Sequence, residues 1–244
     1  MAGNWKMYKT ASETCAFFEK FKPLVAATNH CEIVLCPSFI SLPDAIRATH
    51  GTRIEIGSQN VFWAKEGAYT GEVSPTMVKD AGCKWVLIAH SERRQYFGET
   101  NEDARKKIVA ALEAGLTPVY CIGEQLSERQ AEKTHDVLDS QFQGGTAGLT
   151  LDQFSKLVIA YEPCWAIGTG KVATPEMAAD AHRFIRERAR KSFGDEPAAA
   201  LRILYGGSVK PDNIRGLMAQ PDIDGGLVGG ASLDPNSFAS IVNF

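Results

Sequence analysis

The sequence lacks the features that would place it in a membrane, outside the cell or on nucleic acid. No apolar run approaches the roughly 18 residues of a membrane-spanning helix, and Met1 is followed closely by Asn4 and Lys6 without the apolar core of a signal peptide. The formal net charge is only −3, so no broad basic field attracts nucleic acid or an anionic membrane. We therefore expect a cytoplasmic protein without nucleic-acid or membrane partners.

Metal-binding and disulfide patterns are also missing. The six cysteines have neither CxxC spacing nor paired histidines, which argues against a zinc site and a disulfide framework. Apart from the isolated pair His90 and Glu92 there is no carboxylate and histidine cluster, and no GxGxxG segment follows the first expected strand, which argues against a dinucleotide site. We therefore expect no metal, no cofactor and buried or inert thiols. The cysteines are Cys15, Cys31, Cys36, Cys83, Cys121 and Cys164.

The chain does contain short apolar runs that alternate with longer amphipathic stretches. This alternation predicts parallel strands connected by helices. Residues 86–89 and 157–160 are apolar at successive positions, which predicts strands buried on both faces. The expected strands are Ala2–Lys6, Glu32–Cys36, Glu55–Ser58, Trp85–Ala89, Thr117–Cys121, Val158–Tyr161, Arg202–Tyr205 and Gly226–Val228.

An open doubly wound sheet would show the same alternation. Eight units of about 30 residues favour instead a closed (β/α)8 TIM barrel, and 244 residues with 44% hydrophobic content are close to the roughly 250 residues of such a barrel. No linker or low-complexity tract divides the chain, so we expect a single domain over residues 1–244. Helix signals agree: a helix over 101–114 should end at Gly115, and Thr174 should cap a helix that starts with Pro175.

Polar residues collect where several strands end, and in a barrel these ends meet at one mouth. Glu162 is either an ordinary solvated or salt-bridged carboxylate or, given its apolar neighbours 157–160 and Trp165, a buried base with a raised pKa. His90 is either a packed histidine or an electrophile kept neutral by the dipole of a short helix capped by Ser91.

The first expected strand also ends in polar residues. Lys6 is either a surface cation or a charge aimed into the mouth together with the Asn4 amide, because residues two apart on a strand point to the same side. These alternatives stay open on the residues alone. Lys6, His90 and Glu162 would nevertheless meet around one cavity if the barrel closes.

Glycine clusters follow the last two expected strands, at Gly206-Gly207-Ser208 and at Gly229-Gly230-Ala231-Ser232. Glycine lets backbone N–H groups approach an anion closely, and barrels often bind phosphate after strands seven and eight. The clusters are therefore either simple turns or a phosphate site to which Ser208 adds a hydroxyl.

The segment after Glu162 begins with proline and a bulky aromatic residue, continues with small residues and ends in lysine. Such a loop is either an ordinary surface loop or a lid that moves as one body and excludes water from an unstable intermediate. The expected lid consists of Pro163, Cys164, Trp165, Ala166, Ile167, Gly168, Thr169, Gly170 and Lys171.

Taken together, these segments resemble the triosephosphate isomerase family through nearly the whole chain. Any one of them could arise by chance, but their order is highly specific. The matching stretches are AGNWKM at 2–7, GAYTGE at 67–72, AHSERR at 89–94, YEP at 161–163 with WAIGTG at 165–170, YGGSV at 205–209 and LVGGAS at 227–232.

The resemblance implies a cofactor-free isomerase that interconverts dihydroxyacetone phosphate and glyceraldehyde 3-phosphate through an enediolate, in glycolysis and gluconeogenesis. It implies that Glu162 is the base and His90 the neutral electrophile, because a glutamate base paired with a neutral histidine is the known pattern of this family. It further implies that Lys6 supplies fixed charge and Asn4 a donor. The implied contacts to substrate come from Asn4, Lys6, Gly168, Ser208, Gly229 and Gly230, with Glu92 and Cys121 supporting them.

The resemblance also implies a homodimer. The stretch Gln59–Thr70 is long for a connector and contains Phe62, Trp63 and Tyr69, which a monomer would expose to water. In the family this loop enters the neighbouring subunit, and the position that matches Thr70 reaches toward the partner site near Met7 and Asn4.

The chain departs from the family pattern in two places. The family usually has several residues before the segment that matches Ala2, so we expect a poorly ordered outer end of the first strand. Cys164 stands in the first hinge of the lid, where an aliphatic residue is expected.

Two other functions compete with the isomerase. A non-catalytic phosphate-binding barrel should lack the base or the electrophile. An aldolase needs a Schiff-base lysine, for which Lys6 is the only candidate.

Overall fold

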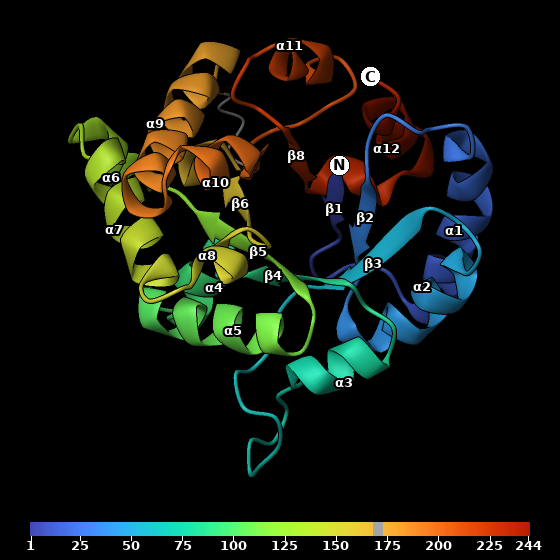
Figure 1. The fold of residues 1–244 in the computed structure, drawn as a ribbon. Helices are drawn as coiled ribbons and strands as arrows, with labels where there is room; N and C mark the ends of the chain where they lie inside the picture. Colours follow the sequence, from blue (N-terminus) through green and yellow to red (C-terminus); the bar gives the residue numbers. More distant parts are fainter. Residues whose placement is uncertain (168–172) are drawn as a thin grey trace.

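The computed structural model describes residues 1–167 and 173–244. At its centre the strands form a closed barrel in which each strand pairs in parallel with the next and β1 pairs with β8 (Figure 1). This arrangement confirms the closed (β/α)8 barrel and excludes the open sheet. The strands are β1 Ala2–Asn4, β2 Ile33–Cys36, β3 Ile54–Ser58, β4 Trp85–Ile88, β5 Thr117–Ile122, β6 Val158–Tyr161, β7 Arg202–Tyr205 and β8 Gly225–Val228.

Two strands end earlier than the sequence predicts, and both ends carry a backbone that L-residues rarely adopt. Lys6 has φ 52° and Ala89 has φ 58°, which is the left-handed region. A residue in that region cannot continue a β-ladder, so β1 stops at Asn4 and β4 stops at Ile88. The same two turns aim Lys6 and His90 at the mouth of the barrel.

Helices surround the barrel and connect its strands. The predicted punctuation is confirmed: Gly115 follows α5 with φ 73°, and the Thr174 side chain accepts a hydrogen bond from Met177 N at the start of α9. The helices are α1 Ala11–Val25, η1 Phe39–Ser41, α2 Leu42–Thr49, α3 Pro75–Asp80, α4 Ser91–Phe97, α5 Asn101–Glu113, α6 Leu126–Gln130, α7 Thr134–Thr146, α8 Leu151–Phe154, η2 Cys164–Ala166, α9 Pro175–Phe193, α10 Asp195–Ala200, α11 Ile214–Met218, η3 Gly230–Leu233 and α12 Pro235–Val242.

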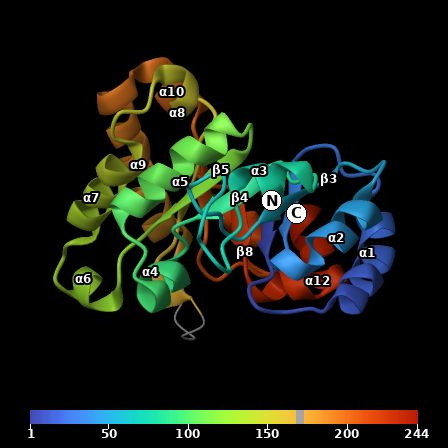
Figure 2. The same ribbon diagram turned by 90° about the horizontal axis from the view of Figure 1, so that it is seen from below.

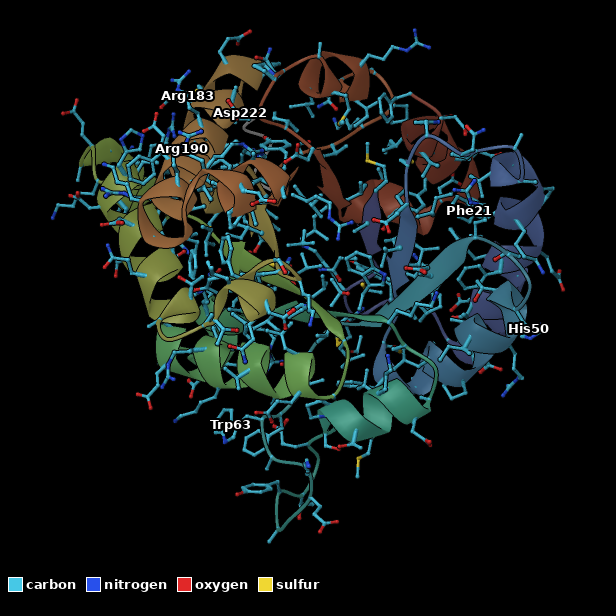
Figure 3. All side chains as sticks on the ribbon, viewed as in Figure 1. Phe21, His50, Trp63, Arg183, Arg190 and Asp222 are labelled. Atoms are coloured by element: carbon cyan, nitrogen blue, oxygen red, sulfur yellow. The ribbon has the colours of Figure 1, made fainter. Side chains whose placement is uncertain are left out.

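The apolar core has two parts. Alternate strand residues such as Val158 and Ala160 fill the inside of the barrel, while Ile159 and Tyr161 point outward into the layer between barrel and helices. β4 and β6 are therefore buried on both faces, as their continuous apolar runs predict. Figure 3 shows Phe21 on the side of α1 that faces the barrel, where it is fully buried.

The two ends of the barrel are distinct. Figure 2 shows α4 and α6, which follow β4 and β5, at one end of the barrel, and α8 and α10, which precede β6 and β7, at the other. The first of these is the end where the strands terminate. Among the described residues, no helix combines the length and the apolar character needed to cross a bilayer.

One segment leaves the body of the molecule. Residues 59–73, which we call the arm, extend away from the barrel between β3 and α3 (Figures 1 and 3). Phe62 stacks on Trp63 with ring centroids 4.1 Å apart and packs against Tyr69 at 4.5 Å. Lys106 of α5 lies 5.2 Å from the centre of the Trp63 ring. These contacts hold the arm in one shape.

Candidate active site

A cavity of about 260 Å³ opens where the strands terminate. It brings together polar residues from five strand ends that are far apart in the sequence, as the barrel geometry requires. All three of Lys6, His90 and Glu162 face it. Its lining is Asn4, Lys6, His90, Glu162, Ala166, Ile167, Gly206, Gly207, Ser208, Val209, Lys210, Leu227, Gly229, Gly230 and Ala231.

Glu162 follows β6 and is almost completely buried, with 2% of its surface exposed. One carboxylate oxygen, Oε1, lies 2.9 Å from His90 Nε2. The other, Oε2, accepts a hydrogen bond from Ser91 N at 2.9 Å, and the Ser91 hydroxyl lies 3.2 Å from Oε1. Both oxygens are thus engaged by the protein, so a substrate must take the place of one of these contacts.

His90 itself caps α4. Its Nδ1 accepts a hydrogen bond from Glu92 N at 3.3 Å. The prediction that Ser91 caps this helix is therefore wrong: Ser91 is the first helical residue, and its N–H is free to bond Glu162. An acceptor at Nδ1 leaves the ring proton on Nε2, which is the nitrogen that faces Glu162.

The Glu162 and His90 pair shifts the pKa of both groups. Burial raises the pKa of Glu162, but the charge and hydrogen bond of His90, the Ser91 N–H and the Lys6 charge together outweigh burial and lower it. The prediction of a raised Glu162 pKa is therefore wrong for this arrangement. Burial lowers the pKa of His90, but the Glu162 carboxylate raises it by more. The hydrogen bond from Glu92 N to Nδ1 favours the neutral His90 ring, whereas the Glu162 carboxylate favours the protonated ring. Separating Glu162 from His90 therefore favours the neutral form of His90.

Lys6 is held in place from both sides of its backbone. Its N–H donates to Asn4 Oδ1 at 3.0 Å, and its carbonyl accepts from Gln59 Nε2 at 2.8 Å. Its Nζ lies 2.5 Å from Glu92 Oε1. These contacts fix the left-handed Lys6 backbone and bring Asn4, Lys6 and Glu92 into one group at the cavity.

Both glycine clusters line the same cavity as Glu162, and a side-chain carbon at Gly206 would lie 2.9 Å from Glu162 Cγ. Gly229 and Gly230 are lining residues, and a side-chain carbon at Gly229 would come 3.5 Å from Lys6 Cε. The loop after β7 is fixed by Asn213, which donates to Ser208 O and accepts from Lys210 N, each at 2.8 Å. Gly168, the remaining predicted substrate contact, lies outside the described residues, as do Thr169, Gly170 and Lys171 of the expected lid.

The beginning of the expected lid packs against a buried carboxylate that sequence reasoning missed. Glu124 is completely buried after β5. It accepts hydrogen bonds from Trp165 Nε1 at 2.8 Å and from the Tyr161 hydroxyl at 3.1 Å, and it pairs with Arg129 at 3.1 Å. A glutamate after an apolar strand was the available signal, since Gly123-Glu124 follows β5 as Glu162 follows β6.

Two cysteines lie near Glu162. Cys121 is completely buried, and burial followed by the Glu162 charge raises its pKa well above the ordinary thiol value. Burial raises the pKa of Cys164 to about 12. Within residues 1–167 and 173–244, no group of three or more His, Cys, Asp and Glu side chains is arranged to hold a metal ion.

The arrangement can carry out one kind of chemistry with its own groups. It offers a buried carboxylate as base, an imidazole N–H as donor, a fixed cation and a glycine-rich wall for an anion. These groups suit the movement of a proton between carbons of a small phosphorylated carbonyl compound.

Comparisons with known proteins agree with this chemistry. The model of the family described as triosephosphate isomerase matches residues 1–244. A triosephosphate isomerase from Solibacter usitatus is 65% identical over 244 residues, which are 100% of this chain and 98% of that relative. Triosephosphate isomerases from Citrifermentans bemidjiense and Clostridium novyi are 55% and 51% identical over 244 residues, which are 100% of this chain and 97% of each relative.

Proposed function

This chain belongs to the triosephosphate isomerase family, and we propose that it interconverts dihydroxyacetone phosphate and glyceraldehyde 3-phosphate with Glu162 as the base. The isomerase activity, and with it a place in glycolysis, follows from the family match over residues 1–244. The residue roles are our proposal. The observation that supports them most strongly is the 2.9 Å approach of Glu162 Oε1 to His90 Nε2 at the wall of the cavity.

The proposed reaction needs one proton transfer in each direction. Glu162 takes a proton from the hydroxymethyl carbon of dihydroxyacetone phosphate, and the electron pair of that C–H bond forms the double bond of an enediolate. Glu162 then returns the proton to the former carbonyl carbon, while the hydroxyl proton passes between the two oxygens. His90 donates its Nε2 hydrogen to the oxygen that gains charge.

Lys6 and Asn4 stabilise the same developing charge. The Lys6 ammonium group contributes a fixed positive charge, and Asn4, which holds the Lys6 backbone at 3.0 Å, contributes an amide donor. Glu92 holds the Lys6 ammonium group at 2.5 Å. Cys121 packs beneath Glu162 and excludes water from it.

The phosphate binds at the glycine-rich wall. Ser208, Gly229 and Gly230 line the same cavity as Glu162, and main-chain N–H groups there can hold the dianion without a metal or cofactor. Gly168 completes this grip by family resemblance. Binding energy from the phosphate then favours closure of the lid that begins at Pro163.

The chain forms a homodimer in which the arm of each copy covers the other copy. Large apolar side chains are exposed in the segments that follow β1, β2 and β4, and Met7 has 94% of its surface exposed. Ile40 and Phe97 are also exposed. A second copy that covered this end of the barrel with its arm would bury them, and Thr70 would reach the partner site. Sedimentation should show a dimer; a fully active monomer at assay concentration would contradict this.

We also propose that residues 1–244 act as one domain in the cytoplasm, in gluconeogenesis as well as glycolysis, with no nucleic-acid or membrane partner. The slightly acidic net charge, −3 over the chain, supports the absence of nucleic-acid and anionic-membrane partners.

A coupled assay with glyceraldehyde 3-phosphate tests the function directly. We expect turnover by the purified protein, loss of kcat in Glu162→Gln and no change in Glu19→Gln, which alters an exposed glutamate of α1. An inactive wild-type protein would overturn the proposed function. Normal turnover by Glu162→Gln would leave the function standing and remove Glu162 as the base.

A further inference from the structure

A glycine in the last turn of α7 marks an unusual contact between helix and barrel. Glycine is less favourable than alanine within a helix, but a side-chain carbon at Gly145 would lie 2.3 Å from Cζ of Tyr120. The missing side chain therefore lets the Tyr120 ring of β5 approach the helix. The Tyr120 hydroxyl donates to the backbone oxygen of Gln141 at 2.6 Å, which fixes this turn of α7 against the barrel.

Gln141 extends from that turn to the end of β5. Its Oε1 accepts a hydrogen bond from Gly123 N at 2.7 Å, and its Nε2 donates to Gly123 O at 3.2 Å. One side-chain amide therefore holds both polar groups of a single residue. Gly123 lies beyond the last residue of β5 and has left the strand ladder, so Gln141 supplies the hydrogen bonds that a neighbouring strand would otherwise make.

The backbone at Gly123 in turn sets the position of Glu162. A side-chain carbon at Gly123 would lie only 1.7 Å from Glu162 O, so the two backbones are in direct contact. Glu162 N donates to Ile122 O at 2.8 Å. Any shift of the peptides at 122–123 must therefore shift the backbone of Glu162.

The same group of contacts reaches the residue beside His90. Arg94 donates from Nη2 to the Tyr120 hydroxyl at 3.2 Å and from Nε to Ala89 O at 3.0 Å. Ala89 is the residue with φ 58° that precedes His90, and its carbonyl belongs to the peptide that enters His90. Arg94, Tyr120 and Gln141 thus connect the backbone behind the electrophile with the backbone behind the base.

We infer that Gln141 is a positioning residue for Glu162: its amide clamps Gly123 and so sets the distance between the carboxylate and His90. Arg94 and Tyr120 anchor this clamp to the backbone of Ala89. The inference rests on the proposed role of Glu162 as the base. Gln141 does not line the cavity, and it acts only through the backbone.

Loss of the clamp should change the surroundings of Glu162. His90 and Lys6, which follow β4 and β1, favour its charged form, while burial favours the neutral form. The thiols of Cys121 and Cys164 also face it, from β5 and from the start of the lid. A carboxylate that moves away from His90 and Ser91 keeps its burial but loses these partners, so its pKa rises.

The test compares Gln141→Met with Gln143→Met. Gln143 lies two residues further along the same helix and is exposed, and its side-chain Nε2 donates to the nearby Asp139 Oδ1 at 2.9 Å. For Gln141→Met we expect kcat to fall about tenfold with little change in KM, because a small displacement of a base is costly whereas the phosphate wall is untouched. The acid limb of the kcat/KM profile should move to higher pH. Gln143→Met should do neither.

A merely structural role for Gln141 predicts another result. Thermal stability would then fall while kcat and the acid limb stayed at wild-type values, and this outcome would overturn the inference. If Gln141→Met does not fold, Gln141→Glu replaces it: glutamate keeps the acceptor for Gly123 N but places an oxygen against Gly123 O, so the same changes are expected.

A readout independent of turnover separates this inference from the proposed function. The 13C carboxyl signal of Glu162 can be titrated whether or not the protein is an isomerase. An upward shift of its pKa in Gln141→Met, absent in Gln143→Met, supports the positioning role. Identical titrations in the two variants contradict it, whereas an inactive wild-type protein contradicts only the proposed function.

Discussion

Glu162→Asp changes the reach of the base and little else. Aspartate is shorter by one carbon–carbon bond, so its carboxylate retreats by about 1.5 Å. In the wild-type structure Glu162 lies 2.9 Å from both His90 Nε2 and Ser91 N, so a retreat of that size breaks both hydrogen bonds. The backbone cannot follow, because Gly123 is packed against Glu162 O and Ile122 O holds Glu162 N at 2.8 Å.

The consequence for the rate follows from the geometry. A misplacement of about 1 Å in a reacting group can cost roughly 10²-fold, so we expect kcat of Glu162→Asp to fall by about 10²- to 10³-fold. KM should change little, because Ser208, Gly229 and Gly230 are unaltered. The measurement is the coupled assay with glyceraldehyde 3-phosphate, with circular dichroism to confirm folding. A kcat within about threefold of wild type would show that the carboxylate position does not limit the reaction.

Three further predictions concern stability and reactivity. His182 is fully buried and its pKa is lowered to about 4. As the pH falls below about 6.5, the unfolded chain therefore takes up a proton at this histidine before the folded chain does. This difference lowers the free energy of unfolding by about 2 kcal/mol at pH 5 relative to pH 7. Urea denaturation should show this loss, and His182→Gln should reduce it; an equal loss in both would contradict the assignment. Gly145→Ala should destabilise the protein although alanine favours helices, because the added carbon would lie 2.3 Å from Cζ of Tyr120; a raised melting temperature would show that the ring can move aside. Cys164, with its pKa raised to about 12, should alkylate slowly at pH 8, and complete modification should slow turnover. Peptide mass spectrometry follows the modification. Fast labelling of Cys164, or unchanged kinetics after complete modification, would refute this prediction.

The fold could be predicted closely from the sequence because barrel strands can be recognised as continuous apolar runs. β6 and β7 have the predicted bounds, and the other strands differ by one or two residues. The differences at Lys6 and Ala89 arise from left-handed backbones that no propensity predicts, since neither residue is glycine. Tertiary contacts, such as Gln59 with Lys6 O at 2.8 Å, hold these conformations.

Part of the candidate active site could likewise be predicted from the sequence, and part of it could not. Glu162, His90, Lys6 and Asn4 are visible in the sequence as polar residues after apolar strands, and the structure brings them to one cavity. The direction of the Glu162 pKa shift was not predictable, because it depends on a 2.9 Å contact with His90 that spans 72 positions of the chain (162 − 90). A local sequence window shows burial, which raises a carboxyl pKa, but not the partner that lowers it.

The residues that lie behind the site were least visible. Gln141 is one of several polar residues on an ordinary amphipathic helix, and nothing in its neighbourhood indicates that it bonds Gly123. Glu124 is likewise a single acidic residue after a strand, although it bonds Trp165 at 2.8 Å. Such contacts depend on how helices pack on the barrel.

Hydrogen exchange at carbon tests the central claim most directly. If Glu162 carries the proton, wild-type protein incubated with dihydroxyacetone phosphate in D2O should place deuterium on carbon in substrate and product, as proton NMR of the two triose phosphates would show. Glu162→Gln should lose both isomerisation and carbon-bound deuterium. Wild-type levels of carbon deuteration by folded Glu162→Gln would show that another group removes the proton.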